Sequence, residues 1–211
     1  MKLFSYFRSS ASYRVRIALN LKGLAYEYVP VNLLQDEQKS PGYLDINPLG
    51  LVPALVLDNG AVLTQSLAIL EYLEETQPEP PLLPAAPEAK SRVRALAASV
   101  ACEIQPLCNI GVTNHLKAAY GAGRSEIDAW YRHWIPRGFA ALEQTLATVE
   151  TPFASGEQPG MADIYLIPQV YNARRFKVDL RPYPHIERIT AACNALSAFR
   201  AAAPEGQPDA P

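Results

Sequence analysis

The pattern of apolar and polar residues at the start of the chain predicts a strand, a helix and a second strand. "KLFSYF" (2–7) alternates as a half-buried strand does, and apolar residues then recur at helical spacing over residues 11–22. Gly23 is placed to close this helix as its C-cap. "AYEYVPV" (25–31) is rich in aromatic and β-branched residues. It predicts a second strand, parallel to the first because a helix connects the two.

The next apolar segments predict a β-hairpin followed by a helix. Residues 54–57 and 61–64 flank the sequence Asp-Asn-Gly at residues 58–60, which is a strong hairpin signal. A helix is expected over residues 66–75. Residues 1–76 therefore contain a β-α-β unit, a loop and a β-β-α unit, which is the order of an α/β thioredoxin-like domain.

A proline-rich segment separates this domain from a helical remainder. "QPEPPLLPAAP" (77–87) is expected to be a linker, because its prolines remove backbone donors and disfavour helix. Residues 88–211 are predicted to form an all-α domain that ends in a tail from residue 204 onward. Its helices are expected at residues 88–106, 110–120, 125–149, 162–176 and 184–200.

The composition indicates an ordinary globular protein that binds a small ligand. The chain has 211 residues, 49% of them hydrophobic, which fits one large domain or two small ones. A net charge of -2 and the absence of long Lys or Arg runs argue against a nucleic-acid surface or a polybasic membrane anchor. Neither a secretory signal nor an apolar stretch of about 20 residues is present, so we expect a cytoplasmic protein.

The cysteines give no sign of a metal or redox centre. Cys102, Cys108 and Cys193 form no C-x-x-C pair, and they have no metal-ligand spacing with the histidines. We therefore expect buried, reduced thiols and no metal.

Two helix starts carry candidate anion-binding residues. Ser9 and Ser10 begin the helix in "SSASYRVRIAL", where a hydroxyl donor and free backbone amides can converge on a negative charge. Gln65 and Ser66 begin the helix after the hairpin in the same way. For serines before a helix a plain N-cap is the commoner explanation, although it does not account for Gln65, so the residues alone do not establish an anion site.

Several motifs resemble the glutathione transferase family. "SSASYRVRIAL" is similar to the zeta-class signature S-S-C-x-x-R-V-R-I-A-L, with Ala11 in place of its cysteine. "LVPAL", "QSLAILEYLEE", "MADIYLIPQV" and "RRFKVDL" resemble further zeta-class segments in the same order. The resemblance extends over residues 3–208 and implies a thioredoxin-like domain joined to an all-α domain.

The resemblance implies glutathione as cofactor and assigns site residues. Ser9 would stabilise the glutathione thiolate and Ser10 would support or cap. Glutathione would be held by Ser9, Ser10, Gln38, Val52, Pro53, Gln65, Ser66 and Gln105. The Val52-Pro53 bond is expected to be cis, against the usual trans preference of X-Pro bonds. Arg8 and Arg175 would hold the carboxylates of the substrate, whereas the neighbouring Arg174 does not match the family's arginine.

The implied activity is a glutathione-dependent cis-trans isomerisation by a homodimer. In the branch that this chain resembles most, maleylacetoacetate becomes fumarylacetoacetate during aromatic breakdown. The alternatives are maleylpyruvate or α-haloacids as substrate, and "EIQPLCNIGV" (103–112) favours the first substrate. A non-catalytic binding protein of the same fold is disfavoured because the motif serines are retained. A glutaredoxin-like reductase is disfavoured because Ala11 leaves no active-site thiol.

Asp163 is expected to have a structural role. It matches a family capping box in which a Ser or Thr stands three residues earlier, but this chain has Gly160 there. Because glycine is a tolerable N-cap, the expected loss is a few tenths of a kcal/mol.

Overall fold

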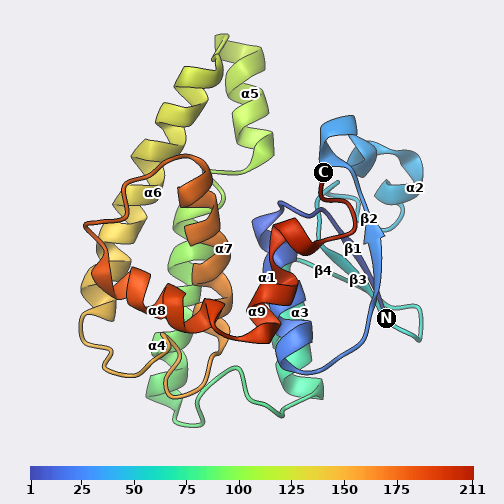
Figure 1. Cartoon of the computed structure of the whole chain (residues 1–211). Coiled ribbons are helices and arrows are strands. Elements are labelled where there is room, and N and C mark those ends of the chain that lie inside the picture. The colour runs from blue at the N-terminus through green and yellow to red at the C-terminus, as the bar shows by residue number, and fades with distance from the viewer. The chain divides into compact units, whose positions relative to one another are not determined.

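The computed structural model describes residues 1–211 as two compact units, shown in Figure 1. The first unit consists of residues 1–81 together with residues 194–211, and the second consists of residues 82–193. The division between 81 and 82 falls inside the segment predicted as a linker. None of the helices combines the length and the apolar character that crossing a bilayer requires.

The first unit is built on one four-stranded sheet in the order β2-β1-β3-β4. The β1 strand is parallel to β2 and antiparallel to β3, and β3 is antiparallel to β4, as the β-α-β and hairpin patterns predict. Its main elements are β1 (Lys2–Ser5), α1 (Ser10–Leu21), β2 (Glu27–Pro30), β3 (Ala54–Val56), β4 (Val62–Thr64) and α3 (Ser66–Thr76). The thioredoxin-like fold of this part is therefore confirmed.

The segment between β2 and β3 holds short helices rather than the predicted loop. They are η1 (Leu33–Gln35), η2 (Glu37–Lys39) and α2 (Pro41–Leu44). Asn32 and Ser40 cap η1 and α2 by accepting hydrogen bonds from main-chain amides. Such short turns lack the repeated apolar spacing by which a helix is predicted from sequence.

The α1 helix is almost wholly buried between other elements of the first unit. It packs against α3 on one side and against α9 (Ser197–Ala202) on another. Gly23 ends it with φ 64°, the left-handed conformation that glycine adopts without a Cβ penalty. Arg14 and Arg16 are buried with the apolar residues of this helix, which the sequence pattern did not predict.

The C-terminal segment belongs to the first unit, which corrects the predicted domain assignment. The helix predicted over 184–200 is interrupted, so that α9 is a separate element. Arg16 Nε donates to the Ala202 carbonyl at 2.9 Å, and Asn20 Nδ2 donates to the Ala198 carbonyl at 3.0 Å. The predicted tail is ordered and contains η4 (Pro204–Gly206). Polar side chains of α1 thus donate hydrogen bonds to α9, a contact that hydrophobic periodicity cannot reveal.

The second unit is helical, as predicted. Its elements are α4 (Pro87–Ala98), the π-helix η3 (Ser99–Ile104), α5 (Ile110–Tyr120), α6 (Arg124–Leu146), α7 (Met161–Arg175) and α8 (Pro184–Asn194). The helix predicted over residues 88–106 changes to π geometry at Ser99. At the end of this π-helix, Ile104 packs against Gly138 of α6. A Cβ at position 138 would collide with the Ile104 side chain, so only glycine permits this close approach.

The α7 helix forms the centre of this unit, and its start has an unusual cap. Asp163 is fully buried and accepts hydrogen bonds from the amides of Ala154, Ser155 and Gly160 at 2.8, 3.1 and 3.0 Å. Burial raises the pKa of the Asp163 carboxyl, and these amides oppose that rise. The structural role expected for Asp163 agrees with these contacts.

Ser155 supplies the hydroxyl that Gly160 lacks. Its Oγ accepts from the Ala162 amide at 3.1 Å, which is the bond that an N-cap side chain normally makes. A Cβ on residue 160 would collide with the Leu82 carbonyl oxygen and lie 2.9 Å from Cβ of Ser155. The serine and the glycine therefore fit each other, and the cap is kept by a residue outside the helix.

We expect Ser155→Ala to lower the free energy of unfolding by about 1 kcal/mol, because a first-turn amide of α7 loses its acceptor. Denaturant titration followed by circular dichroism measures the change. Ser91→Ala, at an exposed serine of α4, is the matched control and should cause no comparable loss. Equal stability of the two variants would show that the Ser155 hydroxyl does not cap α7.

Candidate active site

The strand register brings three segments of the first unit to one end of the sheet. Phe4 lies opposite Ala54, and Ala54 lies opposite Thr64. Because Ala54 begins β3 and Thr64 ends β4, the chain before β3 and the chain after β4 lie beside the chain that leaves β1. These segments carry Ser9, Ser10, Val52, Pro53, Gln65 and Ser66.

Ser9 is the N-cap of α1, and its hydroxyl still has a hydrogen to donate. The Oγ atom accepts from the Ser12 amide at 3.2 Å, while the Ser9 amide donates to the Tyr6 carbonyl at 2.9 Å. A hydroxyl accepts through its lone pairs and donates through its own hydrogen, so capping and binding an anion are compatible here. Ser10 is the first residue of α1 and is half-buried. The capping role that the sequence left open for Ser10 therefore belongs to Ser9.

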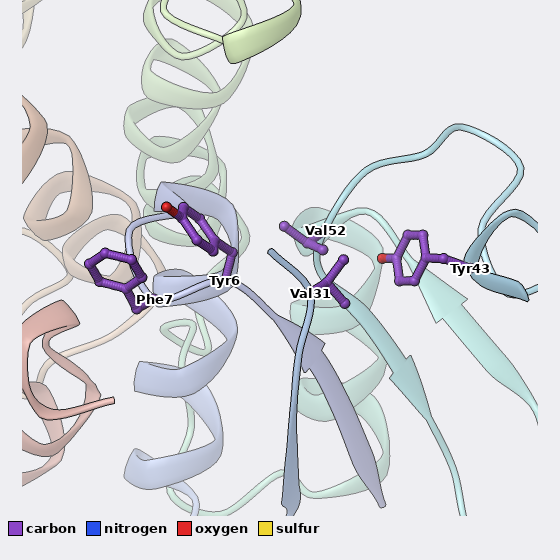
Figure 2. Close-up of a cluster of buried hydrophobic side chains, with 5 residues drawn as sticks. All are labelled: Tyr6, Phe7, Val31, Tyr43 and Val52. Carbon is purple, nitrogen blue, oxygen red and sulfur yellow. The ribbon is translucent and has the colours of Figure 1, made fainter. Parts of the chain in front are cut away.

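The segment before Ser9 is held by an apolar cluster. Figure 2 shows Tyr6 and Phe7 on the stretch that runs from β1 into α1, with Val31, Tyr43 and Val52 on neighbouring stretches. All of these side chains are buried. Removal of their apolar surface from water stabilises the chain segment that leads to Ser9.

The peptide bond between Val52 and Pro53 is cis, as the resemblance implied. The residue before it is also fixed, because the Leu51 carbonyl accepts from the Tyr43 hydroxyl at 2.7 Å and from Asn47 Nδ2 at 2.6 Å. Two side chains from the segment between β2 and β3 thus hold the main chain that leads into β3.

Gln65 has a strained backbone at the start of α3. Its φ is 66° with ψ 118°, a conformation that residues with a Cβ rarely adopt. The Gln65 side chain does not cap the helix. The amides in the first turn of α3 therefore receive no hydrogen bond acceptor from it. Strain of this kind is retained where the surrounding structure imposes it, and it gathers at binding sites.

A buried cation lies behind the start of α3. Arg14 Nη1 donates to Ser66 Oγ at 3.3 Å, and only 2% of the Arg14 residue is exposed. The positive end of the helix dipole and this guanidinium both attract negative charge. The start of α3 therefore favours a negatively charged group. Arg14 was not among the site residues predicted from the sequence. The sequence feature that could have indicated a role for Arg14 is a charged residue among apolar neighbours in α1.

Gln38 offers an unused acceptor in the first unit. Its Nε2 donates to Asp36 Oδ1 at 3.2 Å, whereas its buried Oε1 has no partner. A buried carbonyl oxygen without a donor is costly, which favours a ligand that donates to it.

Arg8 rests against aromatic rings next to Ser9. Its Nη2 donates to the Tyr6 hydroxyl at 3.1 Å, and its guanidinium lies 4.9 Å from the centre of the Phe7 ring. The buried Nε has no partner. Arg8 therefore keeps hydrogen-bonding capacity for a ligand while its orientation is restricted.

In the second unit, Tyr131 connects the segment after Gln105 with the end of α7. Its hydroxyl donates to the Cys108 carbonyl at 2.9 Å, and its ring stacks on Phe176 with the centroids 3.5 Å apart. The Arg175 guanidinium lies 4.8 Å from the centre of the same Phe176 ring. Burial raises the pKa of Tyr131 to about 12, and the charge of Arg175 partly opposes this rise.

Arg174 and Arg175 differ in their surroundings, as the motif suggested. Arg174 Nη2 pairs with the Glu187 carboxylate on the surface at 3.0 Å, while Arg175 lies over the Phe176 ring. Tyr131 was not recognised from the sequence, because a single tyrosine at a core-facing helix position carries no distinguishing pattern.

The cysteines show one difference from expectation. Cys108 and Cys193 are buried, and burial raises the pKa of the Cys108 thiol to about 12, so this thiol is unreactive. Cys102 is exposed, and its predicted burial was wrong. It lies on the π-helix η3, and the absence of cysteine motifs on which the prediction rested carries no information about exposure. No group of three or more potential metal-binding side chains gathers anywhere in the structure.

The fold and these residues define a glutathione transferase. Residues 8–76 match the family model of the glutathione S-transferase N-terminal domain, and residues 122–202 match that of the C-terminal domain. The chain belongs to the glutathione S-transferase family, and the predicted two-part fold class is thereby confirmed.

Its relatives narrow the assignment to the isomerase branch. The chain is 48% identical to maleylacetoacetate isomerase of Pseudomonas aeruginosa, over 100% of this chain and 99% of that protein. It is 50% identical to maleylpyruvate isomerase of a Ralstonia species, over 99% of each. The crystal structure of maleylacetoacetate isomerase from Methylobacterium extorquens AM1 with bound malonate and glutathione is 42% identical, with a TM-score of 0.97 over 100% of both chains.

We expect Gln65→Gly to raise the free energy of unfolding by about 0.5 to 1 kcal/mol, because glycine adopts a positive φ without strain. Thermal and denaturant unfolding measure the effect. Gln77→Gly is the matched control, since Gln77 is also an exposed glutamine but has φ -133°. Equal destabilisation by both substitutions would show that no strain is stored at Gln65.

Proposed function

We propose that this protein is a glutathione-dependent cis-trans isomerase that converts maleylacetoacetate to fumarylacetoacetate. The observation that supports it most is the Ser9 hydroxyl, which stands at the start of a buried helix with a hydrogen left to donate. The segments that carry Val52-Pro53 and Gln65-Ser66 lie at the same end of the sheet. Family membership and the isomerase relatives support the same function.

The residues present fit glutathione. We assign its γ-glutamyl carboxylate to Gln65, Ser66 and the first-turn amides of α3, with Arg14 behind them. The main chain at Val52 is assigned to its peptide backbone. Gln38 offers an acceptor through its free Oε1. Gln105, half-buried at the end of η3, is assigned to glutathione on the family resemblance.

When bound, glutathione supplies a thiolate that adds reversibly to the activated double bond, so that the resulting single bond can rotate before the sulfur leaves. The task of the protein is to keep this sulfur anionic. Lowering a thiol pKa by about two units requires about 2.7 kcal/mol of preference for the anion. A hydrogen bond from the Ser9 hydroxyl is worth about 1.5 to 3 kcal/mol, and the start of α1 adds up to about 2 kcal/mol. Together they suffice.

The substrate carboxylates require cations, and we assign them to Arg8 and Arg175. Both guanidinium groups lie against aromatic rings, which restricts their orientation. The relative from Methylobacterium extorquens AM1 contains malonate, which is a dicarboxylate. Ala11 does not weaken the proposal, because the reaction needs one nucleophilic sulfur and glutathione brings it.

Maleylpyruvate is the second candidate substrate. The relative from the Ralstonia species acts on it, and it is as similar to this chain as the maleylacetoacetate isomerase is. Action on α-haloacids is a third possibility that the family resemblance raises. A non-catalytic binding protein is disfavoured, because the chain retains Ser9, Val52-Pro53 and Gln65-Ser66 together.

We further propose a cytoplasmic homodimer. The first unit exposes several large apolar side chains that would be covered in a dimer. Leu49 is 64% exposed, Leu67 is 48% exposed and Val62 is 42% exposed. Large exposed apolar side chains are typical of protein interfaces when they form a common patch, and a dimer would cover them.

The test is an assay of the purified protein with maleylacetoacetate and maleylpyruvate in parallel, with and without glutathione. We expect rapid isomerisation of maleylacetoacetate only when glutathione is present. Faster turnover of maleylpyruvate would reverse the order of the two substrates. Absence of any glutathione-dependent turnover would favour the binding protein.

We expect Ser9→Ala to lower kcat by about 10²-fold while glutathione affinity changes only a few-fold, because the lost hydrogen bond acts on the thiolate. Steady-state kinetics and isothermal titration measure the two quantities. Ser10→Ala is the control and should retain most of its turnover. A large loss in Ser10→Ala with normal turnover in Ser9→Ala would reverse the assignment.

Arg175→Gln is expected to lower kcat/KM for the dicarboxylate by about tenfold or more, because an amide cannot replace a charged, bidentate donor. Glutathione affinity should stay close to that of the unmodified protein. Arg174→Gln removes the same charge one residue away and should have little effect, since Arg174 pairs with Glu187. Equal losses in both variants would indicate a general electrostatic effect instead of a specific contact.

A further inference from the structure

We propose that Asp209, near the C-terminal end of the chain, is a positioning residue that holds the main chain before Ser9 in the geometry that thiol activation requires. This inference rests on the proposed function. It adds a residue that is 200 positions away from the serine along the sequence and that would act through the main chain.

The direct contact is a hydrogen bond to the segment between β1 and α1. Asp209 Oδ2 accepts from the Phe7 amide at 3.0 Å. The Phe7 carbonyl accepts from Arg16 Nη2 at 2.9 Å. The main chain of Phe7 is therefore held on its amide side by a carboxylate and on its carbonyl side by a guanidinium. Ser9 follows two residues later, and its amide is bonded to the Tyr6 carbonyl at 2.9 Å. A shift of the Phe7 main chain therefore moves the Ser9 hydroxyl.

The second oxygen of Asp209 fixes the carboxylate itself. Oδ1 accepts from the Tyr28 hydroxyl at 2.6 Å, and Tyr28 lies on β2, directly beside β1 in the sheet. Burial and the neighbouring carboxylate raise the pKa of Tyr28, so its hydroxyl remains a donor. The carboxylate thus spans β2 and the segment that leads to Ser9, and an amide side chain has only one oxygen for these two donors.

The rest of the C-terminal segment is anchored independently of Asp209. Gln207 Nε2 donates to the carbonyls of Ala201 and Ala203 at 3.0 and 2.8 Å, and Ala210 packs against the cluster shown in Figure 2. These contacts keep the segment in place when the Asp209 side chain is shortened. Substitution of Asp209 therefore tests the carboxylate and leaves the path of the chain intact.

The experiment compares Asp209→Ala and Asp209→Asn with Glu205→Gln in the full-length protein. Glu205 is an exposed acid in the same segment, with no hydrogen bond to the segment before Ser9, and its substitution removes the same charge. The readouts are hydrogen exchange of the Phe7 and Ser9 amides without glutathione, ultraviolet titration of the bound glutathione thiol, and kcat.

We expect faster exchange of both amides, a higher thiol pKa and an approximately tenfold lower kcat in Asp209→Ala, because small displacements of catalytic groups have large effects on rate. Asp209→Asn should lie between this variant and the unmodified protein, and Glu205→Gln should match the unmodified protein. Tyr28→Phe should shift the same readouts in the same direction by less.

The inference and the proposed function fail in different ways. A normal thiol pKa and kcat in Asp209→Ala, with only a lower melting temperature, would refute the inference, as would unchanged amide exchange. An unmodified protein that binds no glutathione would refute the proposed function, even if the amide exchange data showed that Asp209 holds the segment.

Discussion

The buried guanidinium of Arg16 is the interaction on which the first unit depends. It is fully buried, and its hydrogen bonds end on neutral oxygens, namely the Ser5 hydroxyl and the carbonyls of Tyr6, Phe7 and Ala202. Burial lowers its pKa, and the nearby tyrosines and Asp209 oppose this effect. A buried charge is tolerated only when its donors are satisfied, so these carbonyls must stay where they are. One side chain thereby fixes the end of β1, the start of α1 and the end of α9.

The candidate site uses this rigidity to combine two different anion positions. At the start of α1, a hydroxyl that is already oriented by the Ser12 amide can donate to a sulfur. At the start of α3, the Arg14 guanidinium is buried behind Ser66. In the proposed function, the first position stabilises the anion through a neutral hydroxyl donor, so the sulfur remains nucleophilic. The second position, at the start of α3, has the full positive charge of Arg14 close by. It suits a carboxylate that is bound but does not react.

Local patterns predicted most of the elements, and side-chain networks explain what was missed. Gly23 and the residues of the hairpin act through their own backbone preferences, so their positions follow from the sequence. The burial of Arg16 depends on an acceptor, the Ala202 carbonyl, that is far away along the chain. The hydroxyl that caps α7 comes from Ser155 instead of residue 160, so comparison with a motif position by position could not locate it. The site serines were identified by resemblance, because isolated serines at helix starts are common.

The division of the chain into units has a consequence for how the protein is made. Phe7 and its hydrogen-bond partner Asp209 are 202 residues apart, so the ribosome makes them at widely separated times. Residues 82–193 form a compact unit of their own and can fold while the first unit still lacks α9 and the segment after it. During synthesis the chain therefore carries an unfinished α/β sheet domain with the buried face of α1 uncovered. This domain is completed only after residues 194–211 have been made.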